Sequence, residues 1–275
     1  MATMFRIASS LIFSMAFLLA SPGDAQEAAP WNHGLHSRTR LISGGMSGER
    51  WIAGIEIALD PGFKTYWRNP GESGLPPRFD WTGSENVAAV DIRWPAPSRH
   101  EDAGGVSYTY GEAVVLPVLV TGRDPTKPVR LSVAMDYGIC KDICIPAHAA
   151  LAATLGSDGP HRAAVERALA KVPRSQPLGE RAEVSVAAIE PMGAGGDAFV
   201  VTVRAPEGAR PVLFAEGPEN WYLSTSLPDR DNRFVLTVED RPKDAAGPVP
   251  VRLTLVAGGQ AVETDASLDA GPTPR

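Results

Sequence analysis

Short apolar stretches that alternate with polar residues and end at turn-forming residues recur along this 275-residue chain, and they restrict it to a β-rich fold. The stretch RWIAGIEIALDPG (residues 50–62) is the clearest example, because its apolar residues alternate and it stops at a Pro-Gly turn. The stretches NVAAVDIRW, AVVLPVLV and VRLSVAMDYGIC repeat the pattern. The 27 Gly and 25 Pro are scattered without a period, which is typical of many short strands joined by turns.

The second half of the chain repeats this pattern after one predicted helix. The helix signal is SDGPHRAAVERALAKVP (residues 157–173), with Ser or Asp as a cap and Pro173 as a stop. We therefore predict an all-β protein with β-sandwich domains over residues 27–156 and 177–268, joined by a short helix within residues 157–174. The strands predicted beyond the helix are AEVSVAAIE, AFVVTVRA, PVLFAEG, WYLSTSL, RFVLTVED and VRLTLVAGG.

The first 25 residues have the features of a secretory signal peptide. They contain one positive charge at Arg6, an apolar run of 14 residues from Ile7 to Ala20, and small residues at Gly23 and Ala25. A membrane span needs roughly 20 apolar residues, so this run is short for an anchor. We expect cleavage near Ala25 and an exported protein without stable membrane insertion.

The charge balance argues against a nucleic-acid partner. The chain has 26 basic and 32 acidic residues, a net charge of -6 and no basic block. The glycine-rich GAGG (residues 193–196) lacks the strand and helix context of a nucleotide-binding loop. We expect neither a nucleic-acid partner nor a cofactor.

The segment DYGICKDICIPAHA (residues 136–149) contains the only two cysteines, Cys140 and Cys144. In an exported protein the ordinary expectation is a structural disulfide. A loop this short removes roughly 2 kcal/mol of unfolded-state entropy, against nearly 5 kcal/mol for a hundred-residue loop, so it is a poor staple. Neighbouring thiols do suit exchange, because one readily resolves a mixed disulfide formed at the other.

A metal site is the alternative use of the same segment. Cys140, Cys144 and His148 recur every four positions, which is a soft ligand set suited to Cu(I) or to part of a zinc site. Pro146 argues against a continuous helix that would put all three on one face. Two Cys and one His also fall short of a closed structural zinc site.

Three separated blocks resemble a known family. PGFKTYWRNPGESGLPPRFDWTGSENV, WPAPSRHEDAGGVSYTYGEAVVLPV and YGICKDICIPA are similar to the periplasmic N-terminal region of the DsbD/ScsB thiol:disulfide interchange family, in its ScsB-like branch. The resemblance covers roughly residues 31–155, and a second β domain over residues 177–268 also fits that branch. It implies immunoglobulin-like sandwiches, with Cys140 and Cys144 as a redox pair in which Cys144 attacks and Cys140 resolves.

The resemblance also implies carboxylates near the cysteines. The segment HEDAGGVSY (residues 100–108) corresponds to a capping loop of the family, and Glu101 and Asp102 match its acidic residues as candidate catalytic groups. Small residues stand where the family has aromatic ones. Either Tyr108 or Tyr110 therefore takes over as the cover, or the pair is less shielded.

The family's electron route implies two partners. Nothing in the chain resembles the transmembrane electron carrier or the thioredoxin-like domain of full-length members. We expect a separate membrane electron-donor protein to reduce the pair, and a periplasmic thioredoxin-fold protein to receive the electrons. The alternatives are a copper(I)-binding or copper-stress module that uses the same cysteines, and a structural adaptor with an inert disulfide.

Overall fold

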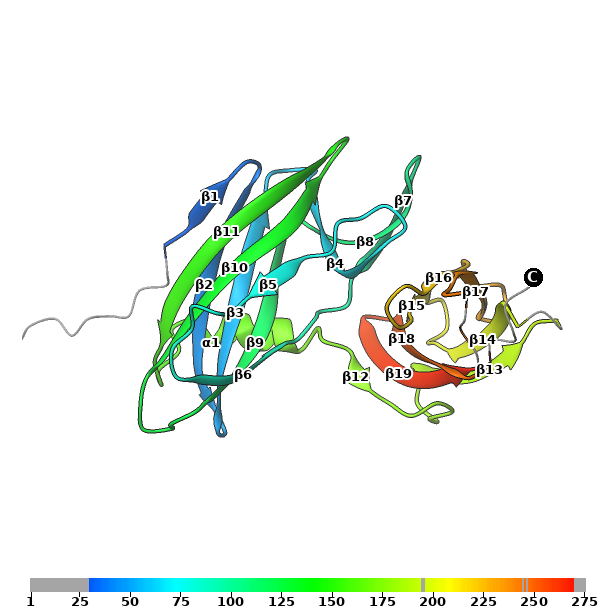
Figure 1. Cartoon of the computed structure of the whole chain (residues 1–275). Coiled ribbons are helices and arrows are strands. Elements are labelled where there is room, and N and C mark those ends of the chain that lie inside the picture. Colours follow the sequence, from blue (N-terminus) through cyan, green and yellow to red (C-terminus); the bar gives the residue numbers. More distant parts are fainter. Residues whose placement is uncertain (1–29, 194–195, 244, 246, 270–275) are drawn as a thin grey trace, which may run out of the picture.

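Two β-sandwiches lie side by side, each around its own hydrophobic core (Figure 1). The computed structural model describes residues 30–193, 196–243, 245 and 247–269. The all-β, immunoglobulin-like prediction is confirmed. The signal peptide predicted for residues 1–25 lies outside the described residues. Within the described residues, no helix has the length and apolar character needed to cross a bilayer.

The first sandwich packs a five-stranded sheet against a six-stranded sheet. In spatial order the first sheet is β1 (Asn32–Gly34), β2 (Ser37–Ser47), β3 (Arg50–Leu59), β9 (Ala113–Gly122) and β6 (Val87–Ile92). The second is β11 (Cys144–Leu155), β10 (Val129–Cys140), β4 (Lys64–Gly71), β8 (Gly105–Gly111) and β7 (Ser98–Asp102), with β5 (Arg78–Asp80) pairing β10.

Strand β10 shows how the alternating sequence builds this core. Its odd-numbered residues are buried in the core, and Leu131, Met135 and Ile139 are completely inaccessible. Because successive side chains point to opposite faces of a strand, the residue after Ile139 faces away from this core. That residue is Cys140, so the alternation of β10 places its sulfur on the outer face of the sheet.

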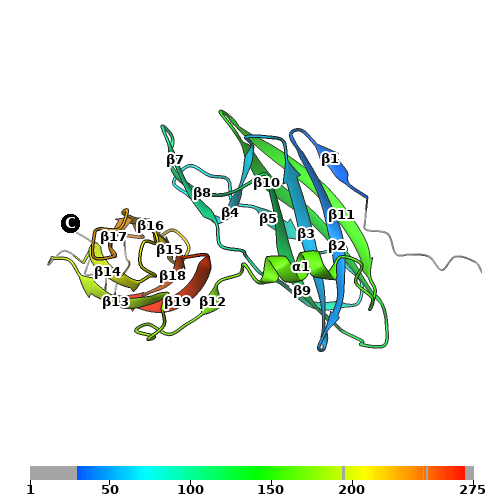
Figure 2. The ribbon, with the colours of Figure 1, turned by 180° about the vertical axis from the view of Figure 1, so that it is seen from behind.

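The helix α1 (Arg162–Leu169) packs on the first sandwich, where Val165 contacts the apolar side chains of Ile42 and Ile52. Figure 2 shows it lying across β2, β3 and β9. The predicted Ser or Asp cap is wrong, because His161 is the N-cap and no side chain caps the helix. Instead, the backbone N–H of His161 donates to the carbonyl of Ser43 in β2, so a tertiary contact sets where the helix begins.

The second sandwich has two four-stranded sheets around a separate core. One sheet is β12 (Arg174–Ser175), β19 (Gln260–Leu268), β18 (Val249–Ala257) and β15 (Val212–Glu216). The other is β13 (Ser185–Pro191), β14 (Ala198–Arg204), β17 (Arg233–Asp240) and β16 (Tyr222–Thr225).

The end of β4 fastens the two sandwiches together. Arg68 donates to both carboxylate oxygens of Glu216 at 2.8 and 2.7 Å, and to Glu263 at 2.5 Å. Burial alone would lower the pKa of Arg68, but the two carboxylates more than offset this and the pKa is raised. Trp67 stacks edge-on against Phe214 of the second sandwich, with ring centroids 5.6 Å apart. The interface therefore combines a part-buried ion network with an aromatic contact.

We expect Arg68→Ala to lower the free energy of unfolding by about 2 kcal/mol, because it removes the ion-pair partner of part-buried Glu216 and leaves part-buried Glu263 with Arg252 alone, at 3.9 Å. Urea denaturation measures this loss, and small-angle X-ray scattering measures whether the two sandwiches separate. The matched control is Arg93→Ala, which removes an exposed pair with Asp91 and should cost less than about 1 kcal/mol. Equal losses in the two variants would contradict the assignment.

Candidate active site at the Cys140–Cys144 disulfide

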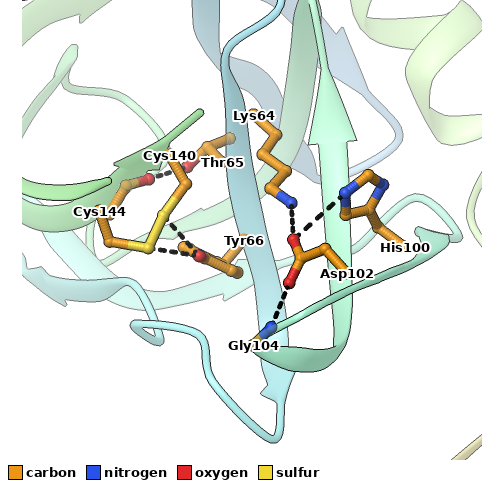
Figure 3. The surroundings of a disulfide bond; sticks show 9 residues. Lys64, Thr65, Tyr66, His100, Asp102, Gly104, Cys140 and Cys144 are labelled. Atoms are coloured by element: carbon orange, nitrogen blue, oxygen red, sulfur yellow. Dashed lines mark hydrogen bonds and ion pairs between the residues drawn. A yellow bond between two sulfur atoms is a disulfide. The ribbon is translucent and has the colours of Figure 1, made fainter. Parts of the chain in front are cut away.

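The two cysteines close a β-hairpin. Cys140 is the last residue of β10 and Cys144 the first of β11, and the two lie directly opposite each other in the ladder. They are joined by a disulfide, with their Cα atoms 4.2 Å apart (Figure 3). The bond therefore lies at the turn end of the hairpin, next to the three-residue loop that joins the strands.

The two halves of the disulfide differ in exposure. Cys140 is 2% exposed, whereas Cys144 is exposed, as is Ile143 beside it at 76%. The outer face of the β10–β11 hairpin is thus covered at Cys140 and open at Cys144. A partner can approach this bond from the Cys144 side.

Tyr66 of β4 covers Cys140. Its hydroxyl donates to Cys140 Sγ at 2.7 Å and lies 3.0 Å from Cys144 Sγ, as Figure 3 shows. Burial raises the pKa of Tyr66 above its usual value of about 10, and the negative charge of Asp102 raises it further. The hydroxyl is therefore protonated at neutral pH and available as a hydrogen-bond donor to sulfur.

Two glycines make room for the Tyr66 ring. A Cβ added at Gly74 would lie 2.6 Å from ring atom Cδ1, and one added at Gly138 would lie 3.0 Å from Cδ2. Thr65 also links β4 to β10, since its hydroxyl donates to the carbonyl of Gly138 at 2.8 Å. The ring is therefore held in a slot that side chains at these two positions would narrow.

Asp102 lies at the tip of the β7–β8 hairpin. It accepts from the backbone N–H of Gly104 at 2.9 Å and from Lys64 Nζ at 3.2 Å, and its carboxylate is 3.4 Å from Nε2 of His100. These contacts, led by the Gly104 bond, hold the pKa of Asp102 below its usual value. Lys64 lies opposite Cys140 in the ladder between β4 and β10, so its partner Asp102 lies near the disulfide. The charge of Asp102 acts on Tyr66, which is hydrogen bonded to Cys140.

The other predicted carboxylate points elsewhere. Glu101 accepts from Nη1 of Arg99 at 2.6 Å, and no hydrogen bond among the described residues joins Glu101 or Asp102 to either sulfur. Of the two carboxylates singled out by the family resemblance, only Asp102 lies where its charge acts on Tyr66.

Neither Tyr108 nor Tyr110 covers the disulfide, so the structure contradicts the first of the two alternatives for its shielding. Tyr108 is buried against Phe214 of the second sandwich, with ring centroids 4.8 Å apart. Tyr110 is also buried, and its hydroxyl donates to the carbonyl of Pro95 at 2.6 Å. Tyr66 takes this place instead. The available signal was its position next to Trp67, because neighbours in a strand face opposite ways and Trp67 is in the core.

The structure does not bring His148 to the cysteines. His148 stands opposite Asp136 in the ladder, with its Nδ1 2.8 Å from Asp136 Oδ1. It is four residues along β11 from Cys144, which is roughly 13 Å in a strand. Across the described ranges, no group of three His, Cys, Asp or Glu side chains could hold a metal ion.

Part of the first sandwich matches a known protein family in sequence. The family described as the N-terminal part of the thiol:disulfide interchange protein DsbD matches residues 41–156, which include both cysteines. Residues 41–156 form a DsbD/ScsB-type N-terminal domain. The disulfide of this DsbD-type domain thus lies within a segment related to thiol:disulfide interchange proteins.

Solved structures extend the likeness of the fold beyond the DsbD-type domain. The N-terminal periplasmic domain of ScsB from Proteus mirabilis matches with a TM-score of 0.68 and 22% sequence identity, covering 89% of this chain and 100% of that chain. That level of identity establishes the fold alone.

The other comparisons add nothing to the argument. An endo-fucoidan hydrolase of glycoside hydrolase family 107 has 10% identity and a TM-score of 0.24, covering 76% of this chain and 29% of that chain. A conserved domain protein from Bacillus anthracis has 12% identity and a TM-score of 0.21, covering 90% and 93%. Both scores are too low to inform the fold. No curated protein matches the sequence at a significant level.

We expect Asp102→Asn to lower the pKa of Tyr66, because it removes the negative charge that disfavours the tyrosinate, while burial continues to raise that pKa. The measurement is a pH titration of ring-labelled tyrosine by NMR, with the Tyr66 signal assigned from Tyr66→Phe. Glu101→Gln is the control and should leave the midpoint in place. A shift of equal size in both variants would contradict a specific effect of Asp102.

Proposed function

We propose that this protein is a periplasmic thiol-disulfide exchange protein, which takes electrons from a membrane electron-donor protein and passes them to exported thioredoxin-fold proteins through Cys140 and Cys144. The observation that best supports this is the asymmetry of the disulfide, in which an exposed Cys144 is bonded to a buried Cys140 that accepts a hydrogen bond from Tyr66. The DsbD-type domain and the likeness to a periplasmic domain of ScsB support the reaction and the compartment.

Reduction begins at the exposed sulfur. A thiolate of a dithiol donor attacks Cys144 Sγ, so that a donor–Cys144 disulfide forms while the Cys140–Cys144 bond breaks and Cys140 leaves as a thiolate. The Tyr66 hydroxyl, already 2.7 Å from Cys140 Sγ, donates to the negative charge that develops there. The second thiol of the donor then attacks the donor sulfur of the donor–Cys144 disulfide and releases Cys144 as a thiolate. The donor leaves as a disulfide, and the pair has gained two electrons and, on protonation, two protons.

Delivery to the exported partner reverses these steps. The Cys144 thiolate attacks the partner's disulfide and forms a mixed disulfide, which releases one partner thiolate. Cys140 then attacks Cys144 Sγ, which re-forms the intramolecular disulfide and releases the partner as a dithiol. Exposed apolar side chains flank the attack site, with Ile143 at 76% and Leu75 at 39% exposure, and they offer a docking surface beside Cys144.

Redox potential separates this function from that of an inert structural bridge. We expect the Cys140–Cys144 couple to have a midpoint above about -300 mV and to equilibrate quickly in graded dithiol buffers, because the bond closes a short loop and one of its cysteines is exposed. Alkylation of free thiols followed by mass spectrometry gives the midpoint. A midpoint below that value, or a bridge that opens only on unfolding, would assign the disulfide a structural role and overturn the proposal.

We expect Tyr66→Phe to slow reduction of the disulfide by dithiothreitol at pH 7 roughly tenfold, because hydrogen bonds to charged groups are among the stronger ones in proteins. Stopped-flow kinetics with thiol-specific quenching measures the rate. The control is Tyr110→Phe, which removes a buried hydroxyl bonded to a carbonyl instead of to sulfur. An unchanged rate in Tyr66→Phe, with both variants folded by circular dichroism, would remove the tyrosine from the mechanism.

A further inference from the structure

A cavity of about 400 Å³ lies between the two sandwiches, away from the disulfide. Its walls come from the end of β4, the residue that follows it and β8 on one side, and from β15, β16 and the end of β17 on the other. Arg68 fixes these walls relative to each other through Glu216 and Glu263, and Asn69 Nδ2 donates to the carbonyl of Ala215 at 3.1 Å. The cavity is therefore preformed, and its volume is in the range of small-ligand sites.

Three carboxylates line this cavity. Glu72 comes from the first sandwich, and Glu239 and Asp240 come from the end of β17 in the second. Each uses one oxygen within the protein: Glu72 accepts from the N–H of Val106, Glu239 from the hydroxyl of Ser224, and Asp240 from a backbone N–H. Among the described residues, no Lys, Arg or His lines the cavity.

Aromatic rings stand beside these charges. Tyr222 is 62% exposed on β16, Trp221 precedes it, and Tyr108 lines the opposite side of the cavity. The face of an aromatic ring attracts a cation through its quadrupole, most strongly for Trp and Tyr. Three carboxylates in a cavity that no described Lys, Arg or His lines, together with these rings, make an environment that favours a positively charged group.

The edge of the cavity also suits a polypeptide. Strand β16 borders the cavity and is the last strand of its sheet, so one side of its backbone pairs with no other strand among the described residues. An extended segment can lie along such an edge while one of its side chains enters the neighbouring pocket.

We propose that this cavity binds the positively charged side chain, lysine or arginine, of an extended segment of a partner polypeptide. Glu239 and Asp240 pair with the charge, Glu72 approaches it from the first sandwich, and Trp221 and Tyr222 stack on the side chain. Neither cysteine lines the cavity, so this binding does not depend on thiol exchange.

The test is an NMR titration of the protein with the peptide acetyl-Ser-Gly-Lys-Gly-Ser-amide, followed at the indole N–H of Trp221 and assigned from Trp221→Phe. The matched probes are the same peptide with norleucine in place of lysine, and n-butylammonium. We expect saturable shifts with the lysine peptide that weaken with added salt, little change with the norleucine peptide, and weaker binding of n-butylammonium.

The double variant Glu239→Gln/Asp240→Asn should weaken binding of the lysine peptide roughly tenfold. The control is Glu49→Gln/Asp158→Asn, which removes the same net charge at exposed positions that do not line the cavity and should leave affinity unchanged. Thermal unfolding of each variant establishes that it is folded. The Cys140→Ser/Cys144→Ser variant should bind normally, so failure of the exchange function would leave this result standing.

Three outcomes would overturn the proposal. They are equal binding of the lysine and norleucine peptides, unchanged affinity in Glu239→Gln/Asp240→Asn, and binding of n-butylammonium as tight as that of the lysine peptide. The last would retain a cation site but exclude a polypeptide as its ligand.

Discussion

Side-chain alternation along β4 connects the Cys140–Cys144 disulfide to the rest of the molecule. Tyr66 faces outward and meets both sulfurs, while its neighbour Trp67 faces inward and reaches Phe214 of the second sandwich. The next residue, Arg68, is clamped between two carboxylates of that sandwich. Because these contacts share one short strand, the position of the tyrosine hydroxyl depends on how firmly the strand is held by the core and the interface.

The electrostatics around the disulfide follow from this placement. Burial and the nearby Asp102 both keep the Tyr66 hydroxyl protonated, so it can donate to a sulfur that becomes negative. Asp102 is itself held by a backbone N–H and by Lys64, on the strand that pairs with the end of β10. The carboxylate that the family resemblance brings forward therefore influences the site through a tyrosine, without a direct bond to sulfur.

Local patterns in the sequence were sufficient to predict the strands and the location of the cysteines. The stretch VRLSVAMDYGIC coincides with β10, because the alternation that defines a strand is visible in neighbouring residues. The contacts that shape the site were not visible, because they join distant segments. Tyr66 and Cys140 are 74 residues apart and Arg68 and Glu216 are 148 residues apart, and no local rule relates them. The predicted helix cap was wrong for the same reason, since a hydrogen bond from the backbone N–H of His161 to the carbonyl of Ser43 in β2 sets the start of α1.

The disulfide is the terminal rung of a ladder in which β10 and β11 pair over twelve positions. Breaking it removes one covalent link at the end of the hairpin and leaves the other eleven pairs and the buried face of β10 in place. The free energy of the redox step is therefore largely separate from that of unfolding, unlike that of a bridge that closes a long loop. In the proposed exchange, reduction would therefore expose little new backbone of this hairpin to a protease, because the pairing of β10 and β11 does not depend on the disulfide.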